Sequence, residues 1–217
     1  MPPRPNRRNG DATRERLVQA AMELFTTAGF LETTTAAIAG RAEVAEGTIY
    51  RHFRSKDELF NETYRRAVRL GLEALAVPDG DRAAGAPERL AGLARRLLRL
   101  AAEDAASARM LLGTTGMAVL DETSRTARRQ FDEGLAQLVA MGKSDGLVRP
   151  GPAELWAQVW LAVVGYAVAR VGTGEWAPDG ALVSLTLDAA WAAIAGSGGS
   201  VRGLGGTTED RQLPGSH

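Results

Sequence analysis

Apolar residues recur along this 217-residue chain at the spacing of one helix face. In the first segment they stand at i, i+3, i+4, i+7, i+8 and i+11, and they are Leu17, Ala20, Ala21, Leu24, Phe25 and Ala28. Asp11 is a suitable cap for the start of this helix, and Gly29 is a suitable residue to end it. The sequence lacks the strict alternation of apolar and polar residues that is typical of strands, so the pattern predicts an all-α fold.

Residues 33–56 predict two short helices joined by a tight turn. Thr34 or Thr35 can cap the first helix, and in the second Ile49 and Phe53 stand at i and i+4 and point inward. The residues left on the outer face are Gly47, Thr48, Tyr50, Arg51 and His52. Such a face suits the major groove of DNA. Glycine lets the backbone approach a phosphate, arginine can pair with guanine, and hydroxyl and imidazole groups can reach phosphates.

A long helix is expected next, over residues 56–76, with Ser55 as its cap. Its apolar residues form one inner stripe, which consists of Leu59, Phe60, Tyr64, Ala67, Val68 and Gly71. Residues 77–86 are rich in turn formers and mark the end of this helix.

Helical periodicity resumes after this break and predicts further helices over residues 90–101, 110–120, 121–141, 152–171 and 179–194. The stretch 155–169 is apolar nearly all round, with Gln158 as its one amide or charged residue. A helix of this kind must be covered on more than one side. One flank can pack on its own domain and the other needs a partner. The last two helices are therefore predicted to form half of a four-helix seam in a homodimer.

Several motifs lie close together between residues 13 and 64. They are AAMELFTTAGF at 20–30, the threonines at 33–35, I-A-x-x-A at 38–42, GTIYRHF at 47–53 and SKDELF at 55–60. Through these motifs the segment resembles the DNA-binding domain of the TetR (tetracycline-repressor) family. The resemblance covers roughly a quarter of the chain. In that family DNA is contacted from the second, third and fourth helices.

The resemblance implies an N-terminal helix-turn-helix domain over residues 11–70, with the helix-turn-helix itself at 33–53, and a helical effector-binding and dimerisation domain over 71–195. Residues 1–10 are expected to be a flexible basic arm, and the Gly-rich residues 196–217 a disordered tail. The resemblance also implies the DNA contacts, which are Thr35, Ala45, Gly47, Thr48, Tyr50, Arg51, His52 and Lys56. Lys56 is expected to hold a phosphate, and a solvated charge is the alternative.

Two residues depart from the family pattern. Ala45 stands where a capping Ser is usual, which would cost about 1 kcal/mol of helix-end stability. Glu46 stands where a basic or neutral residue is common. It suits the positive end of a helix but repels phosphate. Weak or unusual half-site binding is one consequence, and a degenerate DNA reader on a ligand-binding helical dimer is an alternative function.

Composition narrows the function further. The chain has no Cys and only two His, and it has no Gly-rich phosphate loop, so no catalytic or metal site is expected and an enzyme is disfavoured. Residues 1–70 carry 12 basic and 9 acidic residues, whereas residues 71–217 carry 14 and 17. The positive part is the presumed DNA reader. A signal peptide and a membrane span are not expected, so a cytoplasmic protein without a membrane partner is predicted.

The second domain contains side chains that could line a small-molecule pocket. The candidates are Met110, Thr114, Met117, Phe131 and Trp160. The alternative is that these side chains belong to the core or to the dimer seam. Two Gly and two Thr at residues 113–116 weaken a helix, and the chain is expected to bend there around a ligand.

Together these features predict a sequence-specific DNA-binding regulator. It is expected to act as a repressor, to bind a palindromic operator in double-stranded DNA as a homodimer, and to respond to an unknown small-molecule effector without a cofactor. An activator or an architectural DNA binder of the same fold is the alternative.

Overall fold

The computed structural model describes residues 7–76, 84–113 and 116–196, and most of these residues are helical. The first elements are α1 (Arg7–Thr27), α2 (Thr35–Arg41), a short 3-10 turn η1 (Glu46–Thr48), α3 (Ile49–His52) and α4 (Lys56–Leu75). The second group comprises α5 (Ala86–Glu103), α6 (Ala105–Leu112), a 3-10 turn η3 (Met117–Val119), α7 (Glu122–Ser144), α8 (Ala153–Gly172) and α9 (Ala181–Ile194). The prediction of an all-α chain is confirmed for the described residues.

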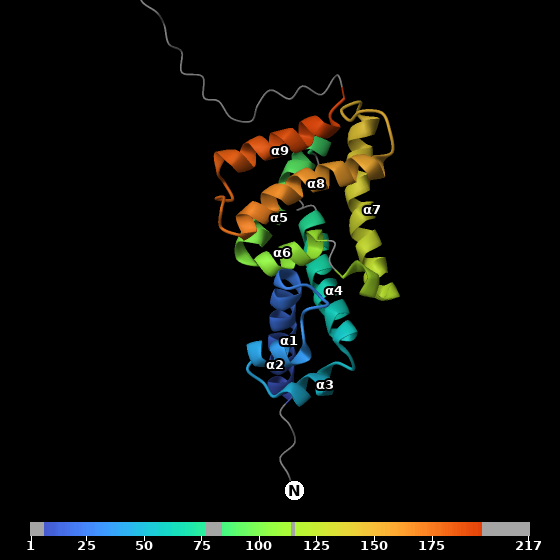
Figure 1. Cartoon of the computed structure of the whole chain (residues 1–217). Helices are drawn as coiled ribbons and strands as arrows, with labels where there is room; N and C mark the ends of the chain where they lie inside the picture. The colour runs from blue at the N-terminus through green and yellow to red at the C-terminus, as the bar shows by residue number, and fades with distance from the viewer. Residues whose placement is uncertain (1–6, 77–83, 114–115, 197–217) are drawn as a thin grey trace, which may run out of the picture.

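The helices form two groups that share α4 (Figure 1). Helices α1 to α3 lie at one end of the molecule and α5 to α9 at the other. Helix α4 runs from the first group into the second and packs against α1 as well as α6 and α7. The domain boundary expected at residue 70 therefore falls inside a continuous helix. The last residues of α4 belong structurally to the second group.

The first helix starts earlier than the sequence suggested. Helix α1 begins at Arg7, so Asp11 lies inside the helix and does not cap it. Residues 7–10 of the expected flexible arm are helical, and residues 1–6 lie outside the described residues. The expected tail, apart from Gly196, lies outside them as well.

The predicted caps and core of the next helices are confirmed. The Thr34 hydroxyl caps α2 by accepting a hydrogen bond from the Ala37 N–H (3.1 Å), and the Ser55 hydroxyl caps α4 by accepting from the Glu58 N–H (3.1 Å). All six residues of the α4 inner stripe are buried. These caps satisfy backbone donors that a helix start leaves without partners.

Residues 110–120 do not form one helix. Helix α6 ends at Leu112, and Gly116 adopts the left-handed region with φ of 77°. A side chain at Gly116 would overlap the Phe60 ring of α4. After the break, Asp121 caps α7 by accepting a hydrogen bond from the Ser124 N–H (2.7 Å).

Glycine 71 allows α4 to approach α6 and α7 closely. A Cβ atom at this position would lie 2.8 Å and 2.9 Å from the two δ carbons of Leu111, and 3.1 Å from a ring carbon of Phe131. Both neighbours are fully buried. The two neighbouring side chains therefore occupy the space that a larger residue would need.

Gly71→Ala is expected to lower the free energy of unfolding by about 1–3 kcal/mol, because an added methyl group overpacks this contact. Chemical denaturation at neutral pH measures the change. Gly40→Ala is the matched control, since Gly40 lies in α2 with nothing within 4 Å of an added Cβ. The control should be neutral or stabilising by up to about 1 kcal/mol. Equal stability of the two variants would contradict the close packing at Gly71.

Candidate nucleic-acid interface

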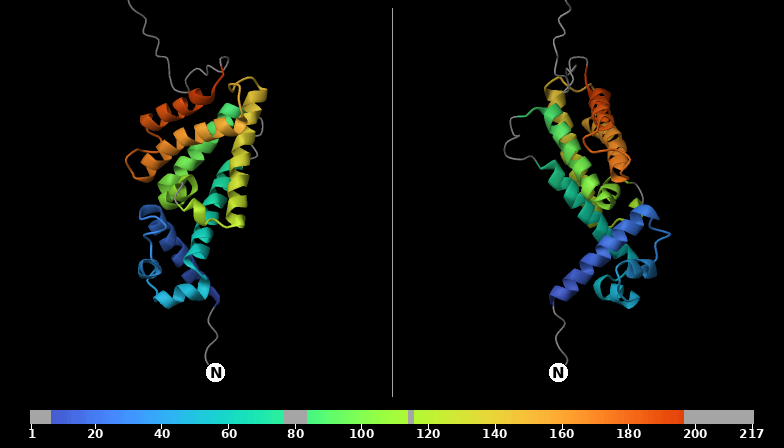
Figure 2. Two further views of the ribbon diagram at one scale, coloured as in Figure 1. Left: turned by 45° about the vertical axis from the view of Figure 1, so that its right-hand side comes forward. Right: turned by 90° about the vertical axis from the view of Figure 1, so that its left-hand side faces the viewer.

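The helix-turn-helix is closed by a tight backbone turn after α2. The Val44 N–H donates to the Ala39 carbonyl (3.0 Å), and the Glu43 N–H donates to the Gly40 carbonyl (3.2 Å). These two bonds form the usual glycine-type end of a helix, but Glu43 occupies the left-handed position with φ of 55°. The turn sets α3 across α2 at the end of the molecule that lies away from α9 (Figure 2).

The recognition segment, defined here as residues 45–53, has one buried and one open side. Ile49 and Phe53 are buried, as predicted. Ala45, Gly47, Tyr50 and Arg51 are exposed, and Thr48 and His52 are half-buried. The segment starts as the 3-10 turn η1 and becomes α-helical only at Ile49, so the reader helix is shorter than the expected continuous helix.

Two of the exposed residues are free of intramolecular constraints. An added Cβ at Gly47 would meet nothing within 4 Å, so the fold does not require a glycine there. Arg51 makes no hydrogen bond or ion pair with any residue in the described part of the chain. Both features leave the backbone at Gly47 and the guanidinium of Arg51 available to a partner molecule.

The start of the recognition segment contains both departures from the family pattern. Ala45 occupies the N-cap position of η1, and its side chain supplies no cap. The Thr35 hydroxyl donates to Glu46 Oε1 (3.0 Å) and lies 3.4 Å from the Tyr50 hydroxyl. Thr35, Glu46 and Tyr50 thus form a small polar cluster on the outer surface, with one residue from each of α2, η1 and α3. The sequence did not predict this cluster.

Lys56 has intramolecular partners. Its ammonium group donates to the backbone carbonyls of Phe30 (2.9 Å) and Thr33 (3.1 Å) and lies 4.3 Å from the centre of the Phe30 ring. It therefore ties the start of α4 to the α1–α2 loop. An ammonium has three donors, so one remains for the predicted phosphate contact. The alternative of a free solvated charge is wrong.

A chain of ion pairs leads from the recognition segment to the second helix group. The Arg14 guanidinium lies 5.1 Å from the centre of the Phe53 ring and pairs with Glu62 (2.9 Å). Glu62 also pairs with Arg65 (3.1 Å), which in turn pairs with Asp121 (3.0 Å) at the start of α7. These residues were not predicted as functional, because their pairing joins distant parts of the sequence.

The pKa values of Glu62 and Asp121 are both lowered in the folded protein. Burial alone would raise the pKa of Glu62, but the hydrogen bonds and charges of Arg14 and Arg65 outweigh it and hold this pKa below its usual range. The pKa of Asp121 is also lowered, because the Ser124 N–H and hydroxyl and the Arg65 charge outweigh the effect of burial.

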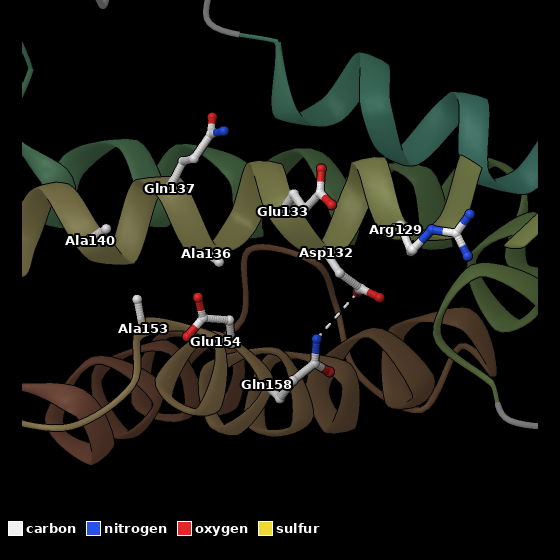
Figure 3. Close-up of a pocket in the computed structure, with 9 residues that line it drawn as sticks. All are labelled: Arg129, Asp132, Glu133, Ala136, Gln137, Ala140, Ala153, Glu154 and Gln158. Atoms are coloured by element: carbon white, nitrogen blue, oxygen red, sulfur yellow. Dashed lines mark hydrogen bonds between the residues drawn. The ribbon is translucent and has the colours of Figure 1, made fainter. Parts of the chain in front are cut away.

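Three of the five residues predicted to line a ligand pocket lie in the core. Met110, Phe131 and Trp160 are buried core side chains, Met117 is 37% exposed, and Thr114 lies outside the described residues. A groove of about 410 Å³ instead runs between α7 and α8 (Figure 3). A second groove of about 310 Å³ lies among α4, α5 and α7. None of the five predicted residues lines either groove.

The groove between α7 and α8 combines polar sides with small apolar residues. Gln158 of α8 donates a hydrogen bond to Asp132 of α7 (3.2 Å), as Figure 3 shows. The small residues are Ala136, Ala140 and Ala153, and Glu154 lies beside them. Sequence periodicity could not indicate this groove, because its lining residues belong to the polar edges of two helices.

Helix α8 is long and apolar enough to cross a membrane, with a mean hydropathy of 1.3. It packs against α5, α6, α7 and α9, and 39% of its most apolar window is buried inside the fold. Such a helix is typical of a protein core that has one further face available to a partner.

Comparison with known proteins identifies the class to which this site belongs. The family described as "Bacterial regulatory proteins, tetR family" matches residues 17–63. These residues include the second half of α1, all of the helix-turn-helix and the first part of α4. No curated protein matches the chain.

Solved structures extend the similarity to both helix groups. A TetR-like transcriptional regulator from Rhodococcus sp. RHA1 is 27% identical, with a TM-score of 0.64 over 82% of this chain and 93% of that one. A putative TetR family regulator from Shewanella sp. PV-4 is 22% identical, with a TM-score of 0.68 over 84% and 98%. AibR, solved in complex with isovaleryl coenzyme A and operator DNA, is 19% identical, with a TM-score of 0.65 over 84% and 97%.

Residues 17–63 thus match the tetR family of bacterial regulatory proteins, and the chain has the fold of solved TetR family regulators. Its N-terminal helices form the helix-turn-helix domain of this family, and its remaining helices complete the fold of the family's regulators.

The ion pairs of Glu62 predict how stability depends on pH. A carboxyl whose pKa is lower in the folded state stabilises the fold above its unfolded pKa of about 4.5, and this contribution is lost as the pH falls through the folded value. Glu62→Gln is expected to cost about 1 kcal/mol at pH 7 and progressively less as the pH falls below 4.5. Urea denaturation of both proteins between pH 7 and pH 3 measures the difference. Glu103→Gln, at the exposed end of α5, is the control, and a pH-independent cost for Glu62→Gln would contradict the ion-pair assignment.

Proposed function

We propose that the protein is a ligand-responsive repressor that binds a palindromic operator as a homodimer. The observation that carries the proposal is the recognition segment itself. An open glycine, an exposed Tyr50 and an unpartnered Arg51 lie together on a scaffold whose opposite side is buried among the described residues. The chemistry of these residues matches phosphates and base edges.

The proposed DNA contacts are those expected from the sequence. Arg51 would read a base, whereas Thr48, His52 and the backbone at Gly47 would contact phosphates. Thr35, Ala45 and Tyr50 lie on the same surface. Lys56 would add a phosphate contact while it also holds the α1–α2 loop.

The dimer is supported by an apolar stripe on α8 and α9. Four large side chains on these helices are more than half exposed, and they are Leu155, Tyr166, Leu182 and Leu185. Exposed alanines lie along the same faces, at Ala162, Ala169 and Ala189. Small residues between large ones allow two helix pairs to pack closely. In a two-fold dimer of this kind the two recognition segments would lie about one DNA turn apart, roughly 34–36 Å.

The effector is proposed to bind in the second helix group. AibR was solved with both isovaleryl coenzyme A and operator DNA, so a relative with this fold binds both kinds of partner. The groove between α7 and α8 has a volume of about 410 Å³, which lies within the usual range for small-molecule sites. It is therefore the first place to look for an effector of this chain.

The repressor role is tested by deleting the gene and following transcription from a promoter that carries the selected operator. Expression should rise if the protein represses, and a fall would identify an activator. Selection of bound sequences from a random duplex library supplies the operator. Binding that is uniform across sequences and lost with salt would instead identify an architectural protein or a degenerate reader.

Arg51→Ala is expected to weaken binding to the selected operator by about 1–3 kcal/mol and to relax sequence choice, because a paired guanidinium discriminates between bases. Fluorescence anisotropy with the operator and with a scrambled duplex measures both effects. Arg54→Ala is the matched control, since Arg54 is exposed three residues further on. Its effect should be the same on both duplexes. Equal losses on both duplexes for Arg51→Ala would contradict a base-reading role.

Leu185→Arg is expected to break the homodimer, because it places a charge at the centre of the proposed seam. Analytical ultracentrifugation should show a shift from twice the chain mass to the 23.0 kDa of one chain. Affinity for the full palindrome should fall, while affinity for a single half-site should not change. Gln130→Arg adds the same charge on the exposed surface of α7 and should leave the dimer intact. A Leu185→Arg protein that stays dimeric would contradict the seam.

A further inference from the structure

The polar cluster of Thr35, Glu46 and Tyr50 places a carboxylate on the surface that is proposed to face DNA. Glu46 is the first residue of η1 and is exposed. Its neighbours in the cluster are two of the proposed DNA contacts, and one of them, Tyr50, is 57% exposed. A carboxylate in this position must either lower affinity for the phosphates or have a hydrogen-bond donor on the DNA.

The carboxylate is held by a hydrogen bond and has no counter-ion. Thr35 donates to Oε1 at 3.0 Å, and no ion pair joins Glu46 to any basic residue in the described part of the chain. The second oxygen, Oε2, has no hydrogen-bond partner there. One oxygen is therefore fixed by the protein and the other remains available as an acceptor, which is the arrangement of a preoriented group.

The chemistry of the major groove restricts what such an acceptor can bind. Guanine and thymine present acceptors there, and they would repel a carboxylate. Adenine presents an amino group beside the N7 acceptor, so a carboxylate that approaches the amino group also meets a repulsive lone pair. Cytosine presents its N4 amino donor without an acceptor beside it, and it is the base to which Glu and Asp side chains pair.

We propose that Glu46 is a specificity-determining residue that accepts a hydrogen bond from the N4 amino group of a cytosine in each half-site, and that Thr35 is the positioning residue that orients it. This inference rests on the proposed function, since it requires the recognition segment to enter the major groove. The sequence alone predicted that Glu46 repels phosphate. The carboxylate selects a base in addition to repelling phosphate.

The test is sequence selection from a random duplex library with four proteins, which are the wild type, Glu46→Gln, Glu46→Ala and Thr35→Val. Wild type should select a palindrome with a cytosine at one fixed position of each half-site. Glu46→Gln should change that base to adenine, because an amide pairs with both N6 and N7 of adenine. Glu46→Ala should lose preference at that position only. Thr35→Val, which removes the orienting hydroxyl, should weaken the cytosine preference without replacing it.

Anisotropy titrations then give the magnitude. Replacing the selected C·G pair by T·A should lower wild-type affinity about fivefold or more, and should change Glu46→Ala affinity less than about twofold. Glu43→Gln is the matched control, since it removes an exposed carboxylate three residues earlier, and it should retain the full discrimination. Melting curves of the free proteins show whether each variant is folded.

Two results would overturn the inference. In the first, wild type selects a palindrome, but Glu46→Gln and Glu46→Ala bind every sequence more tightly with the same base choice. Glu46 would then act only by repelling phosphate, and the proposed regulator would stand. In the second, wild type selects no sequence, and both the inference and the proposed function fail.

Discussion

Helix α4 must be buried along both of its halves at once, and the arrangement of the other helices depends on this constraint. In its first half Phe60 packs against Phe25 and Phe30, with ring centroids 5.2 Å and 5.1 Å apart. In its second half Gly71 admits Leu111 and Phe131. Protein interiors are close-packed, so neither set of contacts can shift by much without the other. The two helix groups therefore do not behave as independent units joined by a linker.

Buried hydrogen bonds fix how α4 joins the two helix groups. The Asn61 side chain is 3% exposed, and it donates to the carbonyls of Asp57 (2.9 Å) and Val119 (3.0 Å) and accepts from the Asp121 N–H (2.8 Å). A buried amide that loses such hydrogen-bond partners destabilises the fold by about 1–3 kcal/mol. A ligand bound in the second group can therefore move the recognition segment only by favouring a different position of α4. It can do so only if its affinity differs between the two positions.

The sequence was most informative where local rules decide the structure. Helical periodicity and the caps at Thr34 and Ser55 depend on residues a few positions apart, and they were predicted correctly. The start of α1 was predicted too late, because Asp11 has the chemistry of a cap but no helix end falls there. The break after Leu112 was expected only as a bend, since its form depends on how Gly116 meets Phe60.

The candidate site was predictable as a set of outward residues but not as a set of contacts. The spacing of Ile49 and Phe53 fixed which side of the recognition segment is open. The partners of Lys56 are carbonyls 23 and 26 residues away, and Arg14, which pairs with Glu62, lies in α1, so no local pattern could indicate these contacts. The predicted ligand-pocket residues could not be distinguished from core residues by sequence for a related reason. Large apolar residues at helical spacing serve a core equally well, and only the packed structure distinguishes the two uses.

The recognition segment combines a weak start with a strong anchor. Its first turn has no side-chain cap at Ala45 and includes only three residues of 3-10 helix, so little intrinsic helix stability holds it. Its far end is fixed by Ile49 and Phe53 in the core and by Arg14 over the Phe53 ring. The Thr35 hydroxyl on Glu46 is the one side-chain hydrogen bond from α2 that holds the first turn within the described residues. That bond supplies part of the order that the missing cap would have given. It also explains physically why a carboxylate can be tolerated on a surface that is proposed to approach phosphates.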